Sequence, residues 1–308
     1  MSALEYMTTV QAAEKWGISD RRVRILCQQG RIAGAYKEGR AYLVPMNVEK
    51  PADGRTKSAV YIVPQEYESM IAAVDVKKAQ LDRRPPLTSG EVQRLREEFL
   101  TDYTYNSNAI EGNTLTLRET AMVLEGITID KKPLKDHLEA IGHRDAFLYV
   151  ERLVKSKAPF TEKIIRDIHS LVLMDRSEDK VVYRRIPVTI SGAYVQPPQP
   201  YLVPKQMEDL VWEYKQSRMH PIYAAALFHL KFEGVHPFID GNGRTGRLLL
   251  NFSLMKSGYP PINVKFADRR AYYDCFDAYY RDGNAAPMVE LVAGYVSERL
   301  AMYLRVLE

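Results

Sequence analysis

The chain has 308 residues, of which 46% are hydrophobic and 27% are charged, a composition typical of a soluble globular protein with enough material for two domains. No run of 18 apolar residues is present, and the first residues lack a basic segment followed by an apolar one. We therefore expect no membrane span and a cytoplasmic location. Cys27 and Cys275 lie far apart without metal-ligand spacing, which favours two thiols over a disulfide.

The formal net charge of +4 is confined to the first fifth of the chain. Residues 1–57 contain ten Lys/Arg and six Asp/Glu, whereas the remainder is formally neutral. This uneven distribution indicates two parts with different roles.

Two short helices are predicted near the start of the chain. The first covers residues 9–16 and ends at Gly17, and the second covers residues 20–29. Two short helices joined by a glycine-containing turn are typical of a helix-turn-helix. Recognition helices meet DNA through their first turns. In the second helix these turns carry three basic residues, Arg21, Arg22 and Arg24.

The segment that follows predicts a β-hairpin. Residues 35–44 carry β-forming side chains on both sides of Glu38-Gly39, with Lys37 and Arg40 near the turn. Together, residues 1–50 resemble the small winged helix-turn-helix modules of the excisionase and MerR-like type. Such modules bind DNA or dock onto proteins, so both roles stay open. Residues 51–57 combine turn formers and charges without an apolar period, which predicts a linker.

Residues 58–308 are predicted to be mostly α-helical, because apolar residues recur there at helical spacing. A short β-branched run at residues 59–63 is the exception before the first of these helices. The predicted helices cover residues 66–81, 89–111, 115–124, 133–154, 162–172, 204–217, 221–233, 268–280 and 285–307. A further helix is predicted to start at or just after the Gly-Asn-Gly turn at residues 241–243 and to include the apolar residues 248–255.

The most informative stretch is residues 236–247, His-Pro-Phe-Ile-Asp-Gly-Asn-Gly-Arg-Thr-Gly-Arg, between two apolar helical segments. A Gly-Asn-Gly turn at a helix N-terminus can point several backbone N–H groups at phosphate oxygens. Arg244 and Arg247 are three residues apart, so we expect both to reach one polyphosphate. Asp240 offers a hard oxygen ligand for Mg²⁺. His236, with a reference pKa of roughly 6.5, suits a general base.

This stretch resembles the signature of the Fic family, His-Pro-Phe-x-(Asp/Glu)-Gly-Asn-Gly-Arg-x-x-Arg, and matches all nine specified positions. The resemblance implies a helical Fic core with a β-hairpin flap. It also implies a Mg²⁺-dependent adenylyltransferase that moves AMP from ATP to a Tyr, Thr or Ser hydroxyl of a protein target, including the chain itself, with His236 as the base. The implied nucleotide-binding residues are Gly241, Asn242, Gly243, Arg244, Thr245, Gly246 and Arg247.

A second motif lies upstream, at residues 107–112. Ser107 and Glu111 are four apart and share a helical face, and Gly112 is placed to end the helix. The motif resembles (Ser/Thr)-x-x-x-Glu-(Gly/Asn) of self-inhibited Fic proteins. The resemblance implies that Glu111 pairs with Arg247. An arginine held by a carboxylate cannot also clamp the γ-phosphate of ATP, so we expect inhibition from within the chain.

Residues 183–197 alternate β-forming side chains around Ser191-Gly192. In Fic proteins the corresponding hairpin is the flap over the active site, and its edge can pair with an extended target segment. The resemblance further implies that Tyr272 or Tyr273 borders the adenine. Phe238 is expected to be a buried anchor of the loop.

Three alternatives stay open. Because the motif binds phosphates rather than the base, another nucleotide donor is one alternative. Removal of AMP, with Glu111 positioning a water, is the second. The third is a DNA-binding regulator in which the nucleotide site is a sensor. A homodimer is compatible with the sequence as well.

Overall fold

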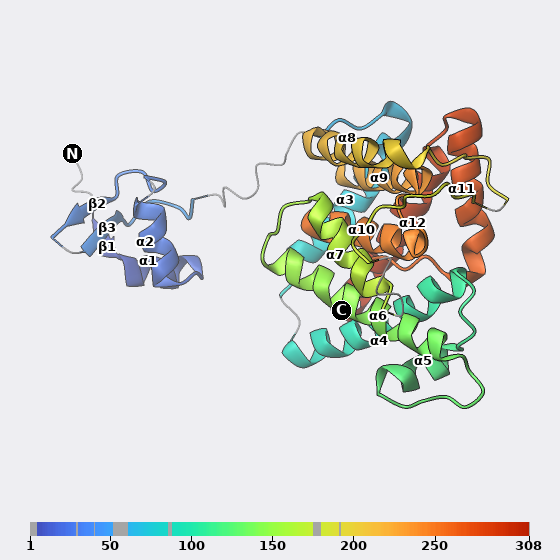
Figure 1. The fold of residues 1–308 in the computed structure, drawn as a ribbon. Coiled ribbons are helices and arrows are strands. Elements are labelled where there is room, and N and C mark those ends of the chain that lie inside the picture. Colours follow the sequence, from blue (N-terminus) through green and yellow to red (C-terminus); the bar gives the residue numbers. More distant parts are fainter. Residues whose placement is uncertain are drawn as a thin grey trace. The chain divides into compact units, whose positions relative to one another are not determined.

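A computed structural model describes residues 5–28, 30–39, 41–51, 61–85, 88–174, 180–190 and 192–307. The chain divides into two compact units, Met1–Val60 and Tyr61–Glu308, and each is considered by itself (Figure 1). Within the described residues, the three-stranded sheet belongs to the first unit and the second unit is helical. No helix of this part of the chain is long and apolar enough to cross a membrane.

The N-terminal unit consists of two helices and a small antiparallel sheet in the order β1-β3-β2. Its elements are β1 (Tyr6–Thr8), α1 (Thr9–Trp16), α2 (Asp20–Gln28), β2 (Tyr36–Glu38) and β3 (Ala41–Pro45). The Thr8 side chain caps α1, and Gly17 ends it in the left-handed conformation. The two helices and the hairpin are confirmed, whereas β1 was not predicted. Gln29, Arg40 and linker residues 52–57 lie outside the described residues.

The three arginines predicted to meet DNA lie on α2. Arg21 and Arg24 are exposed, and Arg22 is partly buried. Arg24 Nη2 lies 2.5 Å from Asp20 Oδ2, one helical turn earlier. DNA binding through this helix stays a prediction.

The second unit contains the helices that the apolar periodicity predicts, with ends that differ by a few residues. They are α3 (Glu68–Asp82), α4 (Ser89–Ile110), α5 (Leu117–Leu124), α6 (Leu134–Lys155), α7 (Glu162–Val172), α8 (Val203–Gln216), α9 (Pro221–Val235), α10 (Asn242–Lys256), α11 (Arg269–Asp282) and α12 (Ala286–Val306). Short 3₁₀ helices occupy Gln65–Tyr67, Pro200–Leu202 and Phe266–Asp268. In the run predicted as a strand at residues 59–63, Ile62 forms one parallel bridge with Met219.

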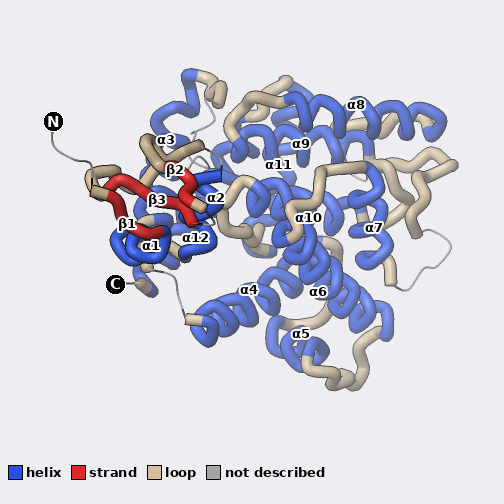
Figure 2. The backbone as a smooth tube through the Cα atoms, turned by 90° about the vertical axis from the view of Figure 1, so that its left-hand side faces the viewer, coloured by secondary structure: helices blue, strands red, loops and turns tan. Residues whose placement is uncertain are grey.

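Helix α10 is the central helix of this unit. Leu248, Leu249 and Phe252 pack into a core shared with α4, α6, α7, α8 and α9. Leu250 and Leu254 pack into a second core shared with α3, α9, α11 and α12. Figure 2 shows α10 between α9 and α6, which are among the helices it contacts most. Because α10 is buried on two sides, its N-terminal turn is held firmly in place.

The hairpin predicted for residues 183–197 is wrong in its strand pairing. No strand forms in the described residues of this segment, 183–190 and 192–197; Ser191 lies outside them. The buried Arg184 anchors the segment, donating from Nε to His236 O at 2.8 Å and from Nη2 to Pro198 O at 2.5 Å. Pro187, Pro197 and Pro198 lack the N–H groups that a ladder requires. The segment is therefore an extended loop.

Candidate active site

The loop between α9 and α10 is built by its own side chains. His236 ends α9 in the left-handed conformation, with φ of 47°, and Gly241 precedes α10 with φ of 76°. Asn242 Oδ1 accepts from Phe238 N–H, and its Nδ2 donates to Phe238 O, both at 2.9 Å. Both polar ends of Asn242 thus bond to the backbone of Phe238, and a contact of this side chain with phosphate stays a prediction. In the structure these two bonds close the turn.

Phe238 is the buried anchor that the sequence predicts. Its ring is fully buried and stacks on His169, with centroids 3.5 Å apart and planes 7° apart. His169 Nε2 lies 3.0 Å from Asp240 O. The ring and the hydrogen bond together tie the loop to α7.

Truncation of this anchor should destabilise the whole unit. We expect Phe238→Ala to lower the free energy of unfolding by about 3–5 kcal/mol, because it leaves a cavity in a close-packed core. Its neighbour Ile239 is 41% exposed, so Ile239→Ala should cost less than about 1 kcal/mol. Urea unfolding of both variants measures the difference. Equal costs would show that the Phe238 ring does not hold the loop.

His236 lies at the edge of a cavity with its ring 20% exposed. Its Nδ1 is 3.3 Å from Glu233 O and 3.9 Å from Glu233 Oε2. Burial lowers the pKa of His236 below its ordinary value. The ring is therefore neutral at pH 7, and with Nδ1 turned to the carbonyl, Nε2 is available to accept a proton.

Arg247 is buried and held by the upstream motif. It donates from Nε to Ser107 Oγ at 3.0 Å, and from Nη2 to Ser107 O at 2.7 Å and Glu111 Oε1 at 2.8 Å. Glu111 is the C-cap residue of α4, directly after Ile110, and Gly112 follows with φ of 91°. A Cβ at Gly243 would collide with Glu111 Oε1, so glycine leaves room for the carboxylate. The predicted pair of Glu111 and Arg247 is confirmed.

Arg244 does not line the cavity with Arg247, and its contact with a polyphosphate stays a prediction. The side chain of Arg244 is buried, with Nη1 3.0 Å from Glu139 Oε1 and Nη2 3.4 Å from Asp240 Oδ1. Glu139 comes from α6, so a buried counter-charge far away in sequence turns Arg244 away from the cavity. The ion pairs of Arg244 with Glu139 and Asp240 are expected to position Asp240 and the loop.

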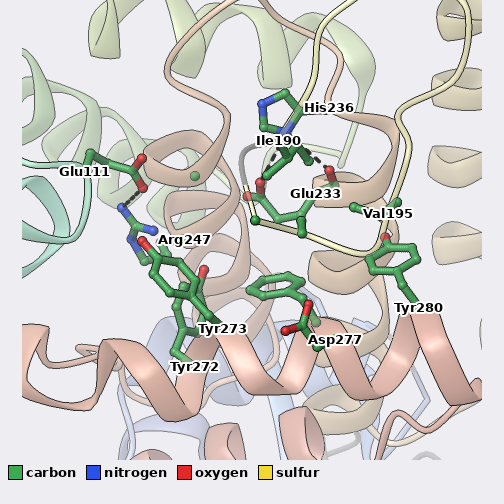
Figure 3. Close-up of a pocket in the computed structure, with 14 residues that line it drawn as sticks. Glu111, Ile190, Val195, Glu233, His236, Arg247, Tyr272, Tyr273, Asp277 and Tyr280 are labelled. Atoms are coloured by element: carbon green, nitrogen blue, oxygen red, sulfur yellow. Dashed lines mark hydrogen bonds and ion pairs between the residues drawn. The ribbon is translucent and has the colours of Figure 1, made fainter.

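Figure 3 shows the cavity that Glu111, His236 and Arg247 line. Its volume is about 470 Å³, in the range of small-molecule sites. Arg247 and Glu111 lie at one end, and His236 and Glu233 lie above the middle (Figure 3). The lining residues from α11 are Tyr272, Tyr273, Phe276, Asp277 and Tyr280, and those from the extended loop are Ile190, Gly192, Ala193 and Val195. One charged end and one aromatic side suit a nucleotide.

Comparisons with known proteins agree with this geometry. The family model for the Fic/DOC family matches residues 159–254. A solved fragment of Fic-1 from C. elegans is 30% identical, covers 77% of this chain and 72% of its own, and superposes with a TM-score of 0.70. The chain belongs to the Fic/DOC family. A Fic domain signalling protein from Bacteroides thetaiotaomicron is 27% identical, with a TM-score of 0.71 over 77% of this chain and 97% of its own.

Curated Fic relatives carry a named activity. Protein adenylyltransferase Fic of Drosophila willistoni is 35% identical over 77% of this chain and 48% of its own length. The protein of the same name from Drosophila melanogaster is 35% identical over 70% of this chain and 44% of its own. The chain thus spans about half the length of the curated relatives it matches.

The Fic motif residues predicted to bind nucleotide divide into two groups. Gly243 and Arg247 line the cavity, whereas Asn242, Arg244 and Thr245 are buried within the protein. Gly241 forms the turn, and a Cβ at Gly246 would collide with Glu233 Oε1. The buried residues therefore shape the turn, whose backbone N–H groups are expected to face the phosphates.

Asp240 is the predicted metal ligand of the Fic motif. Its side chain is 32% exposed, and Oδ1 accepts from Gly241 N–H at 2.6 Å. In the described part of the chain no cluster of three or more His, Cys, Asp or Glu side chains could hold a metal ion. Mg²⁺ usually needs only one or two carboxylates, because substrate phosphates and waters complete its shell. A single partly exposed carboxylate fits an ion that arrives with its nucleotide.

Four residues that line the cavity were not predicted from the sequence, namely Glu233, Phe276, Asp277 and Tyr280. Tyr272 or Tyr273 was predicted to border the base, and both line the cavity. Tyr280 and Asp277 extend this wall by two further turns of α11, and Phe276 lies between them in sequence. Glu233 lies three residues before His236, one helical turn earlier on α9. Its helical spacing from the histidine was the available signal.

Proposed function

We propose that this chain transfers AMP from ATP to a protein hydroxyl and that Glu111 holds it inactive. The observation that carries the proposal is the pair of Arg247 and Glu111 in the same cavity as His236. The cavity combines a cation for phosphates, a neutral imidazole and an aromatic wall. The naming of curated relatives as protein adenylyltransferases supports the same reaction.

The residues have distinct roles in the proposed reaction. The triphosphate lies at the N-terminus of α10, where backbone N–H groups and the helix dipole favour negative charge. Mg²⁺, held by Asp240 and the phosphates, would neutralise part of that charge. His236 takes the proton of the target hydroxyl, the hydroxyl oxygen bonds to the α-phosphorus, and the bond from that phosphorus to pyrophosphate breaks.

Inhibition follows from competition for one guanidinium. Arg247 has its Nε and Nη2 groups engaged by Ser107 and Glu111. In the proposed active state Glu111 leaves, and the γ-phosphate takes the place of its carboxylate on Arg247. Charge-assisted hydrogen bonds of this kind are about twice as strong as neutral ones. While Glu111 stays on Arg247, the γ-phosphate lacks this contact, and the nucleotide is misplaced.

The extended loop is the proposed docking edge for the target. Ile190, Gly192, Ala193 and Val195 border the cavity without strand partners among the described residues. An extended target segment can add to such an edge through backbone hydrogen bonds. This pairing would deliver a side-chain hydroxyl beside His236.

The test compares label positions on ATP with the Glu111→Gly variant and Mg²⁺. We expect label from the α-phosphate, and not from the γ-phosphate, to become attached to the protein. Label from the γ-phosphate would replace the proposal with phosphate transfer. Stronger labelling from another α-labelled nucleoside triphosphate would change the donor. Release of AMP from pre-labelled protein only when Glu111 is present would favour removal of AMP.

A further inference from the structure

Two carboxyl groups flank the single guanidinium of Arg247. Positions 243, 246 and 247 lie on one face of α10, because residues three and four apart are neighbours on a helix. Glu111 lies over Gly243 and Glu233 lies over Gly246, each so close that a Cβ on the glycine would collide with its Oε1. Glu111 forms an ion pair with Arg247. Glu233 has no role in the reaction as proposed so far.

Glu233 occupies an unusual position for an acid. Its side chain is 12% exposed, and its Oε1 is buried without a hydrogen-bond partner among the described residues. Burial and the nearby Glu111 carboxylate raise the pKa of Glu233 to about 8, against the opposing effect of Arg247. The titratable groups around it are Glu111 from α4, Arg247 from α10, Tyr272, Tyr273 and Tyr280 from α11, and His229 and His236 at its own helix.

We propose that Glu233 stays protonated in the active state and donates a hydrogen bond to an anionic oxygen of the bound nucleotide. This inference rests on the proposed function, in which phosphates replace Glu111 beside Arg247. The single positive charge of Arg247 cannot balance both a triphosphate and an ionised Glu233. In a cavity of low dielectric the triphosphate and a Glu233 carboxylate would repel each other. A neutral carboxylic acid removes that repulsion and adds a donor.

The proposal predicts a specific pH dependence. The pKa of Glu233 is raised, so the acid is neutral below about pH 8 and ionises above it. Nucleotide affinity should therefore be retained at neutral pH and fall as pH rises through this range, by up to about tenfold for each further pH unit. Removing Glu111 removes one negative neighbour, and the bound phosphates supply another. Binding in the alkaline range should accordingly take up a proton.

The experiment uses the 308-residue chain with Glu111→Gly and a non-hydrolysable ATP analogue with Mg²⁺. Titration calorimetry from pH 7 to 9, in two buffers that differ in ionisation enthalpy, measures affinity and proton uptake. We expect net proton uptake on binding within this pH range in this protein. Adding Glu233→Gln, which keeps an N–H donor and cannot ionise, should abolish the uptake and flatten the pH profile. Adding Glu233→Ala should weaken binding about tenfold relative to Gln, as loss of a donor to a charged group predicts.

A control and three contrary results complete the test. Glu208→Gln changes an exposed acid on α8 and should leave uptake and affinity unaltered. Equal uptake with and without Glu233→Gln would overturn the proposal. Gln and Ala variants that bind equally weakly would show that a hydrogen-bond donor at this position does not support binding, which would also overturn the proposal. No binding by the Glu111→Gly protein at all would overturn this inference together with the proposed function. Binding with proton uptake but without AMP transfer would leave the inference standing and remove the proposed function.

Discussion

Glu111→Gly is expected to raise the rate of AMP transfer on the order of 10³-fold. Arginine contacts to transferring phosphates are worth roughly 10³–10⁵ in rate in other enzymes, and in the wild-type chain Glu111 holds Nη2 of Arg247 at 2.8 Å. Substitution by glycine frees the N–H group that this nitrogen donates to Glu111, while its bond to Ser107 O is retained, and removes a negative charge from the cavity. The initial rate of self-modification with labelled ATP measures the gain.

The chain offers a matched control for this substitution. Glu125 is the C-cap residue of α5, as Glu111 is of α4, with nearly the same backbone angles and a glycine with positive φ after it. Glu125 forms no contact with Arg247 in the structure. Glu125→Gly therefore reproduces the change at a helix end without freeing the guanidinium, and its rate should equal that of wild type. An equal gain from both variants would show that helix flexibility, and not the ion pair, limits transfer.

His236→Ala, made in the Glu111→Gly background, is expected to reduce transfer by about 10²–10⁴-fold, the usual contribution of a general base. Nucleotide binding should change by no more than a few-fold, since the imidazole is proposed to contact the hydroxyl and not the phosphates. The lowered pKa of His236 adds a second expectation. Transfer should persist at pH values below 6.5 and fall only when the ring becomes protonated.

Parallel rate and binding measurements separate this role from a structural one. Loss of transfer with retained binding of a non-hydrolysable analogue supports the base. Loss of both would assign His236 to the shape of the loop, where it ends α9 with positive φ. Unchanged transfer would place the base elsewhere in the cavity.

Local sequence patterns predicted most of the helical unit. Apolar periodicity located its helices, and residues such as Thr88, Thr116 and Thr161 begin three of them as side-chain caps. The Fic motif and the upstream motif, through their family resemblance, predicted the contact of Glu111 with Arg247 across 136 positions of sequence. Spacing within one helix placed Ser107 on the same side as Glu111.

Features that depend on distant partners were not predictable in this way. Helical spacing alone suggested that Arg244 reaches the phosphates, but in the structure Glu139 of α6 supplies a buried partner that turns it away from the cavity. The alternation at residues 183–197 suggested strands, but Arg184 anchors that segment to the loop after α9. Glu233 is conspicuous only when α10 brings Gly246 beneath it. Each of these outcomes is set by tertiary packing.

The intact mass of the protein after incubation with ATP and Mg²⁺ tests the central claim most directly. Wild type, Glu111→Gly and Glu111→Gly with His236→Ala are compared under the same conditions. We predict that the single variant gains the mass of an adenylyl group, while wild type and the double variant gain little or none. Equal modification of wild type and Glu111→Gly would contradict inhibition through Arg247. No adenylyl gain in any of the three, with nucleotide still bound, would contradict the proposed transfer itself.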